Sequence, residues 1–276
     1  MLPLSATKKT AVLGPFATAQ QQLLGSYFDI ACPGALPGES GPVAVWDCIE
    51  TPLAAVANIT GRENVLTSTR QSGTAGAVAT AKLADQVILF LGETDEGEGH
   101  DRKNTTIDEA QEAMALGVIA TGKPTVVVLL HGGILSVDRL AGPEKPNALV
   151  NAWFPGIKGA EAMAKSLFGV PGWNRWGKMT ATMYSSSFSS LVPMLDMSFT
   201  SGLGRTYRYW RGPAPLFEFG HGLCERVCPR CLFLRWCPPG RFLTSHVTRA
   251  VCSSDDIFAR MEESCITPGD SDFQPD

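Results

Sequence analysis

Short apolar runs alternate with helix-like segments along the first part of the chain. Strands that are apolar on both faces are typical of a parallel sheet with helices covering both sides. Residues 178–184 instead alternate between polar and apolar side chains, which predicts an edge strand. We therefore predict an α/β fold, with a mostly parallel sheet and helices on both faces (an α/β sandwich). The runs that we expect to form the buried strands are residues 10–14, 86–92, 125–133 and 148–156.

Three segments between these strands have helical character. Residues 74–85 are rich in alanine, and residues 158–169 end at a glycine that suits a helix C-terminus. The third segment begins at "TIDE" (residues 106–109), which has the form of a capping box. In such a box the Thr106 hydroxyl accepts a hydrogen bond from an unpaired backbone N–H of the first helical turn, and the Glu109 side chain accepts one from the backbone N–H of Thr106. The sequence thus predicts a helix that starts directly behind Thr106.

Composition limits the class of protein. The net charge is −4, so the chain lacks the basic field that binds nucleic acid, and we expect no nucleic-acid partner. No apolar run reaches the length of a membrane span, and the start "MLPLSATKKT" lacks the apolar core of an export signal. Six of the eight cysteines lie in the last part of the chain. We therefore place a boundary there, between a domain at residues 1–223 and an irregular Cys-rich tail at residues 224–276.

The tail allows three interpretations. Its first four cysteines have the spacing C-x3-C-x2-C-x5-C, which lacks the second paired spacing of a convincing zinc site. The cysteines could instead form disulfides, or the segment could be disordered or come from a mispredicted reading frame. We expect the last of these, and we predict no bound metal and no cofactor. The four cysteines concerned are Cys224, Cys228, Cys231 and Cys237.

An acidic cluster directly follows a predicted buried strand. The segment "GETDEGEGHDR" (residues 92–102) carries five carboxylates. In an open α/β sheet, ligands bind outside the carboxyl ends of the strands, which is where this segment is expected to lie. "HGG" (131–133) and "FPG" (154–156) follow two further strands toward the same edge. A solvated loop, a catalytic carboxylate and a site for a hard cation all remain open at this point.

The order of motifs is more specific than any single motif. Together they resemble the C-terminal α/β sandwich domain of glycoside hydrolase family 3, and most closely its β-xylosidase and α-arabinofuranosidase branch. The resemblance covers residues 2–223. The motifs that carry it are "LPLSATKKTAVLGPFA", "LLGSYF", "TPLAAV", "LFLGETDEGEGHDR", "VVVLLHGG", "NAWFPGIKGAEAMAKSLFG", "GKMTATMY", "LVPMLDM", "GRTYRYW" and "PLFEFGHGL".

The resemblance implies a retaining glycosidase whose acid/base glutamate lies in the acidic cluster. Glu96, Glu98, Asp101 and Arg102 match the E-x-E-x-x-D-R pattern of the xylosidase branch. We rank Glu98 slightly ahead of Glu96 as proton donor, and we expect Arg102 to pair with Asp101, both near the substrate. Glycoside cleavage needs one carboxyl with a raised pKa, and neighbouring carboxylates raise a pKa by disfavouring further negative charge.

His131 and three tryptophans are weaker candidates. The family stretch that matches "HGG" is usually S-G-G, so His131 departs from the pattern. We include it as a candidate substrate contact, although packing is the more common role of such a histidine. Trp153, Trp173 and Trp176 could stack on sugar faces, but tryptophans in such positions are more often part of the core.

The nucleophile is the missing half of the predicted site. In the family an aspartate in a preceding (β/α)8 barrel attacks the sugar, and no segment here matches it. We therefore interpret the chain as a fragment of a β-xylosidase-like enzyme acting on oligo- or polysaccharide of cell walls, with no appreciable turnover alone. The alternative is a non-catalytic carbohydrate-binding remnant or pseudo-enzyme. The family, with sequons at Asn58 and Asn104, indicates an extracellular or cell-wall location.

Overall fold

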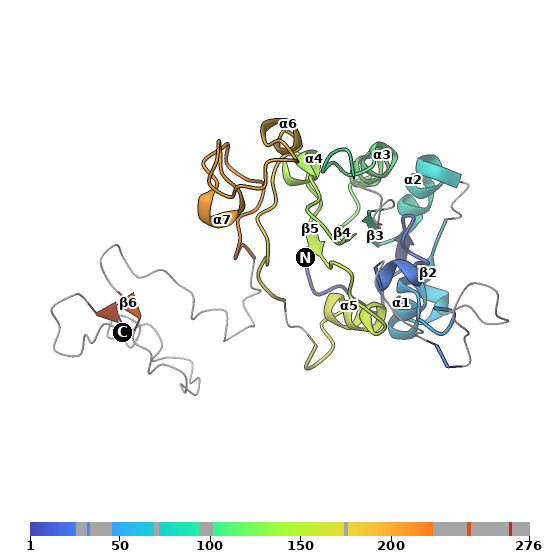
Figure 1. Ribbon diagram of the computed structural model, residues 1–276. Coiled ribbons are helices and arrows are strands. Elements are labelled where there is room, and N and C mark those ends of the chain that lie inside the picture. Colours follow the sequence, from blue (N-terminus) through green and yellow to red (C-terminus); the bar gives the residue numbers. More distant parts are fainter. Residues whose placement is uncertain are drawn as a thin grey trace. The chain divides into compact units, whose positions relative to one another are not determined.

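The computed structural model describes residues 1–25, 32–33, 46–68, 72–93, 102–173, 176–222, 242–243 and 265–266. Contacts divide the chain into two units, Met1–Leu223 and Cys224–Asp276. In the second unit, two short strands pair antiparallel, β6 (Phe242–Leu243) and β7 (Cys265–Ile266). The labelled helices α1 to α7 all belong to the first unit (Figure 1).

The first unit is built on a five-stranded sheet in the order β2-β1-β3-β4-β5. Each neighbouring pair runs parallel, which confirms the predicted parallel α/β fold. The chain adds β2 on one side of β1 and then adds β3, β4 and β5 in turn on the other side. The boundary between β1 and β3 is therefore the topological switch point of the sheet. The strands are β1 (Thr10–Leu13), β2 (Val65–Leu66), β3 (Gln86–Gly92), β4 (Thr125–Leu130) and β5 (Ala148–Asn151).

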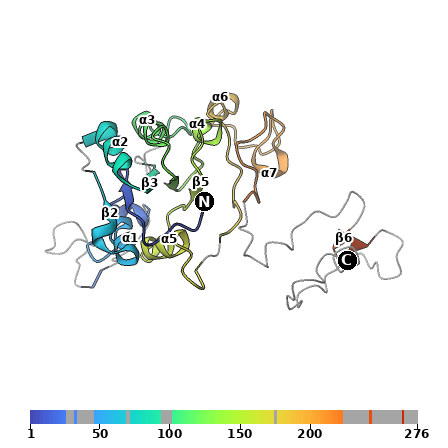
Figure 2. The same cartoon turned by 180° about the vertical axis from the view of Figure 1, so that it is seen from behind.

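Helices cover both faces of the sheet. Helices α1 and α5 lie together on one side, and α2, α3 and α4 lie on the other (Figures 1 and 2). Alternate residues of β3 divide between the two cores: Ile88 and Phe90 face α1 and α5, whereas Val87 and Leu89 face α2 and α3. The helices are α1 (Pro52–Thr60), α2 (Gly73–Leu83), α3 (Glu109–Ile119), α4 (Asp138–Ala141), α5 (Gly159–Leu167), α6 (Phe188–Leu191) and α7 (Thr206–Tyr209), with single 3₁₀ turns η1 (Gln21–Leu23) and η2 (Arg62–Asn64).

The predicted start of α3 is wrong by two residues. Asp108, not Thr106, caps the helix, and its carboxylate accepts from Gln111 N at 3.1 Å. Thr106 forms an isolated bridge with Ser136, and its hydroxyl donates to Asn104 Oδ1 at 2.5 Å. Because that bridge holds Thr106 in an extended backbone, the next residue with a suitable short polar side chain takes the cap.

The predicted edge strand at residues 178–184 is also wrong. The segment contributes only an isolated antiparallel bridge between Met183 and Phe217, outside the five-stranded sheet. The segments predicted as strands at 125–133 and 148–156 end earlier than expected, at Leu130 and Asn151. After β5, Ala152 and Trp153 continue the apolar run and pack on the core, so hydrophobic periodicity alone does not mark the end of that strand.

Two cysteines of the first unit form a disulfide that the sequence alone does not predict. The Cα atoms of Cys32 and Cys48 lie 5.5 Å apart, and 16 positions separate the two residues in sequence. Cys32 is buried and belongs to the core formed with α1 and α5, whereas Cys48 is exposed.

Candidate active site at the carboxyl edge of the sheet

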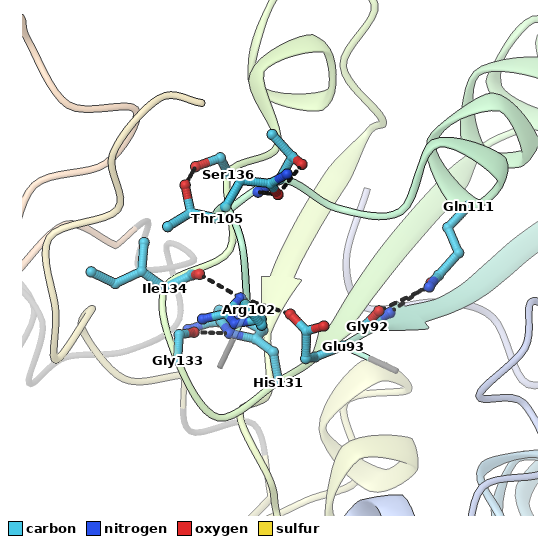
Figure 3. Close-up of polar contacts among 12 residues, drawn as sticks. Gly92, Glu93, Arg102, Thr105, Gln111, His131, Gly133, Ile134 and Ser136 are labelled. Carbon is cyan, nitrogen blue, oxygen red and sulfur yellow. Dashed lines mark hydrogen bonds and ion pairs between the residues drawn. The ribbon is translucent and has the colours of Figure 1, made fainter. Parts of the chain in front are cut away.

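The candidate site lies where β3 and β4 end. Gly92 and Leu130 are the last residues of these strands and are paired in register, so Glu93 and His131 follow side by side (Figure 3). Glu93 N continues the ladder by donating to Leu130 O at 2.9 Å. Because β3 is one of the two strands at the switch point, Glu93 stands at the edge where open α/β sheets bind ligands. Glu93 is the first carboxylate of the acidic cluster.

Glu93 forms an ion pair with Arg102, at the other end of the cluster. Arg102 Nη1 lies 2.6 Å from Glu93 Oε2, and the two side chains are only 20% and 10% exposed. The same nitrogen donates to Ile134 O at 3.0 Å. Asp101, the expected partner of Arg102, lies outside the described residues. The guanidinium is engaged by Glu93 and by the loop after β4, so one of the five carboxylates already has its counter-charge.

Gln111 of α3 holds the last residue of β3. Gly92 N donates to Gln111 Oε1, and Gln111 Nε2 donates to Gly92 O, both at 2.9 Å. The side chain of Gln111 is buried. Its one amide group therefore pairs with both the backbone N–H and the backbone C=O of Gly92, which would otherwise be buried polar groups at the end of the strand. Figure 3 shows this contact on one side of Glu93 and the Arg102 contact on the other.

The chain behind Arg102 is joined to the loop behind β4. Ser136 N donates to Thr105 O at 2.6 Å, and Ile107 N donates to Ser136 O at 3.1 Å. The hydroxyls of Thr105 and Ser136 lie 2.7 Å apart, and Ser136 Oγ also donates to Tyr184 O. The chain is thus hydrogen-bonded to the sheet edge or its loops on both sides of the acidic segment, at Glu93 and again at Thr105.

His131 is a packed histidine in the structure. It is fully buried, and the centroid of its ring lies 4.8 Å from that of Trp153. Nδ1 lies within hydrogen-bond distance of Gly133 O, and Nε2 contacts the side-chain amide of Asn151 at the end of β5. Both partner atoms, Gly133 O and Asn151 Oδ1, are oxygens that accept, so a ring nitrogen that carries a proton donates to its partner. These contacts favour packing over substrate binding.

Trp153 adjoins this group through an uncommon backbone conformation. Its φ is 54°, in the left-handed region that side chains other than glycine rarely adopt. The side chain is half-buried and packs with the core on the α2 and α3 side. The carboxyl edge is therefore lined in order by Glu93, His131, Asn151 and Trp153.

Three of the predicted site residues, Glu96, Glu98 and Asp101, lie outside the described residues. Within those residues, no three His, Cys, Asp or Glu side chains come together as metal ligands would. No helix in the described part of the chain has both the length and the apolar character to cross a membrane. The cysteines that suggested zinc or disulfides in the tail, from Cys224 to Cys237, also fall outside it.

Sequence reasoning missed the roles of Glu93 and Gln111. Glu93 is one of five carboxylates in the acidic cluster, and nothing in the sequence gives it a separate role. Gln111 carries a usable signal, because Gln111, Ala115 and Val118 recur at helical spacing and are the three buried residues of α3. A long polar side chain in an otherwise apolar stripe indicates a buried hydrogen-bonding task.

The family is shown by comparison with known proteins. A model of the Glycosyl hydrolase family 3 C-terminal domain matches residues 1–224. The chain therefore belongs to glycosyl hydrolase family 3, and the matched part is the C-terminal domain of that family. By family it is a glycoside hydrolase.

The relatives it resembles include xylosidases of fungi and plants. It is 31% identical over 234 residues to the probable exo-1,4-beta-xylosidase xlnD of Aspergillus flavus, covering 81% of this chain and 28% of the relative. It is 32% identical over 231 residues to the probable beta-D-xylosidase 7 of Arabidopsis thaliana, with the same coverage. A solved GH3 exo-beta-xylosidase, XlnD, in complex with a xylobiose aziridine activity-based probe, superposes with a TM-score of 0.67 at 30% identity, over 80% of this chain and 28% of that one. The chain thus spans about 28% of the length of these relatives.

Proposed function

We propose that this chain supplies the general acid/base carboxyl of a retaining β-glycosidase with xylosidase-like specificity. Glu98 is the first choice for that carboxyl and Glu96 the second. The nucleophile comes from a (β/α)8 barrel domain that these 276 residues do not encode. The observation that carries the proposal is the ion pair between Glu93 and Arg102, which brings both ends of the acidic segment to the carboxyl edge of the sheet.

The chemistry requires two carboxyl groups in different protonation states. In the first step the protonated glutamic acid gives its proton to the glycosidic oxygen as the C1–O bond breaks, while the barrel carboxylate bonds to C1. In the second step the same glutamate, now ionised, takes a proton from water as the water oxygen attacks C1. The sugar leaves, the barrel carboxylate is released, and the glutamic acid is protonated again. Each turnover consumes one water molecule.

The substrate and the compartment follow from the relatives and from the disulfide. The named relatives are β-xylosidases, so we infer that the bond cleaved is a β-xylosidic bond at the end of an oligo- or polysaccharide. Disulfides persist in oxidising compartments, so the bond between Cys32 and Cys48 supports an extracellular location. Of the candidate substrate contacts, we keep Asp101 and propose an indirect role for Arg102.

The test joins the 276-residue chain to the barrel domain of one of the xylosidase relatives. The relative's own C-terminal domain, joined through the same linker, serves as positive control. Turnover is measured on aryl β-xylosides with poor and good leaving groups. Because only a poor leaving group needs protonation, Glu98→Gln or Glu96→Gln should lower kcat/KM by about 10²–10⁴-fold on the first substrate and far less on the second.

A matched variant guards against a loss of folding. Glu109→Gln removes an exposed carboxylate at the start of α3 and should leave both substrates unaffected. Azide, a nucleophile that needs no general base, should restore the second step in the true acid/base variant and give a glycosyl azide. If neither glutamine variant separates the two substrates, the acid/base proposal is wrong. Sugar binding without turnover would then favour the carbohydrate-binding remnant.

A further inference from the structure

Exposed apolar side chains are concentrated in one stretch near the end of the first unit. Within the described residues, eight of the twelve large apolar side chains that are exposed lie there, and we call these eight the apolar surface. Single exposed apolar residues are normal on a protein, whereas such a concentration marks a surface that contacts something else. All but one lie in residues 185–216, which we call the lobe and which contain α6 and α7 (Figure 1). The eight are Leu191, Met194, Leu195, Met197, Phe199, Tyr207, Tyr209 and Phe219.

The lobe is attached to the domain beside the candidate site. Met183 and Phe217 form the bridge at its base, where Met183 N donates to Phe217 O at 2.8 Å and Phe217 N donates to Met183 O at 3.2 Å. Tyr184 O accepts from Ser136 Oγ at 2.9 Å, and the backbone of Ser136 also bonds Thr105. The lobe is therefore joined to the loop after β4, at the carboxyl edge of the sheet.

The exposed residues are not the core of the lobe. That core is formed by the rings of Tyr184, Phe188 and Trp210, whose centroids lie between 4.2 and 5.6 Å from one another. Tyr207 and Phe219 instead stack on each other at the surface, with their centroids 4.3 Å apart. The apolar surface is thus left over after the lobe has packed its own interior.

Hydrogen bonds fix the loop that carries the most exposed of these residues. The Asp196 carboxylate accepts from Ser198 N at 3.0 Å and from the Ser201 hydroxyl. Arg205 Nη2 donates to both Pro193 O and Asp196 O at 2.5 Å. A loop that is already ordered loses little conformational entropy when it binds, so it is preorganised for a partner. The side chains that it presents are Met194, Leu195 and Met197, which are 65%, 88% and 84% exposed.

The composition of the lobe favours a protein partner over a sugar. The lobe contains three arginines and one aspartate, and it contains neither lysine nor glutamate. The buried cores of protein interfaces are enriched in aromatic residues, Met and Arg and depleted of Lys and Glu. Leu195 and Met197 also offer no flat ring on which a sugar could stack. The excess of arginine favours a partner whose face carries carboxylates.

We propose that the apolar surface is the docking surface for the domain that supplies the nucleophilic carboxylate, and that it meets an apolar face of that domain bordered by acidic residues. This inference rests on the proposed function. The two carboxyl groups of a retaining glycosidase act at a separation of about 5–5.5 Å, so the second domain has to be held against the carboxyl edge, to which the lobe is attached. The matched part is about 28% of the length of the named relatives, so they contain further chain that can cover this surface.

The first experiment compares the chain alone with the barrel-joined protein. Amide hydrogen exchange is followed in peptides that cover residues 193–201 and, for reference, α2. Joining the barrel domain should slow exchange at residues 193–201 by about tenfold or more and leave α2 unchanged. Exchange that is equally slow in the chain alone would mean that the tail or a second copy of the chain covers the surface, and would overturn the proposal.

The second experiment places a charge on the apolar surface. Leu195→Asp should leave the Tm of the chain alone unchanged, because the side chain is 88% exposed. In the barrel-joined protein it should remove the protection of residues 193–201, because docking would bury an unpaired charge. It should also lower kcat/KM by about tenfold or more on poor and good leaving groups alike, because docking precedes both reactions. If Leu195→Asp does not fold, Met197→Asp makes the same change two positions further on.

A matched variant places the same charge elsewhere. Leu83→Asp lies on α2, where the side chain is 73% exposed, and it should change neither the exchange nor kcat/KM.

The outcomes separate this inference from the proposed function. If residues 193–201 are no better protected in the barrel-joined protein, or if Leu195→Asp behaves like Leu83→Asp, the docking surface is wrong and the proposed function is unaffected. If no glutamine variant of the acidic segment distinguishes the two substrates, the acid/base proposal fails. Protection that Leu195→Asp removes would support the docking surface even then.

Discussion

Gln111 and Gly92 bond each other twice, through one side-chain amide and the backbone N–H and C=O of one glycine, with both contacts at 2.9 Å. The contact joins the first turn of α3 to the last residue of β3 in a buried environment. It places a strand end and a helix start at a fixed separation, directly beside Glu93.

Replacing Gln111 with leucine should destabilise the domain by about 2–4 kcal/mol, because the change leaves a buried N–H and a buried C=O without partners. Ala113→Leu puts the same side chain at an exposed position of α3 and should change the free energy of unfolding by less than about 0.5 kcal/mol. Urea unfolding of the two variants makes the comparison. Equal midpoints would contradict a structural role for the amide contact.

Reduction of the disulfide between Cys32 and Cys48 should lower the free energy of unfolding by about 3 kcal/mol, because a closed loop of this size restricts the unfolded chain. The measurement is the urea midpoint with and without a thiol reductant. A variant with both cysteines changed to serine should be as unstable as the reduced protein and should no longer respond to the reductant at this site. If the urea midpoint of the parent protein does not change with the reductant, the disulfide is not formed or does not stabilise the domain.

Gly14 should not tolerate alanine. Its φ is 98°, and a Cβ there would lie 2.1 Å from Phe90 O on the neighbouring strand. Gly122 is a matched control, because its φ is 72° and a Cβ added to it would meet nothing within 4 Å. Gly122→Ala should cost only the left-handed backbone term, about 1–2 kcal/mol, whereas Gly14→Ala should cost clearly more because β1 and β3 must separate. Thermal unfolding of both variants measures the difference.

Stability should decrease in acid through Glu161 of α5. The hydrogen bond from Lys165, at 2.6 Å, and the charge of that lysine lower the pKa of Glu161 below its ordinary value of 4.5. A carboxylate with a lowered pKa contributes stability above its unfolded value, and the contribution is lost as the pH falls through the folded value. The free energy of unfolding of the parent protein should therefore be slightly higher than that of Glu161→Gln at neutral pH and equal to it in strong acid. Lys165→Met should reduce the pH dependence of that difference to the smaller part that Lys158, 3.7 Å from Glu161 Oε2, contributes, as urea midpoints across the pH range would show.

The parallel sheet was predictable because its strands are apolar on both faces. The runs at β1 and β3 are bounded by a glycine, and their ends were placed within a residue. Residues 178–184 show the limit of the same method. Their alternation reflects packing of Met183 against the core, and without a neighbouring strand the segment makes only one bridge.

The place of the site was predictable, but its internal contacts were not. An acidic segment that directly follows a buried parallel strand must lie at the carboxyl edge of the sheet, and this holds without knowledge of the strand order or of the side-chain contacts. The partner of Arg102 depends on the register between β3 and β4, which puts Glu93 next to the loop that contains Ile134. That register is set by long-range pairing, so adjacency in sequence gave no indication of Glu93, while the predicted contact with Asp101 lies outside the described residues.

The strand order also governs how synthesis relates to assembly. β1 is made first, yet one of its two neighbours, β3, ends at Gly92, and the next strand follows more than thirty positions later. A ribosome-bound chain that stops before β3 exposes one whole side of β1 to other nascent chains. The centre of the sheet can therefore assemble only after translation has carried the chain past β3.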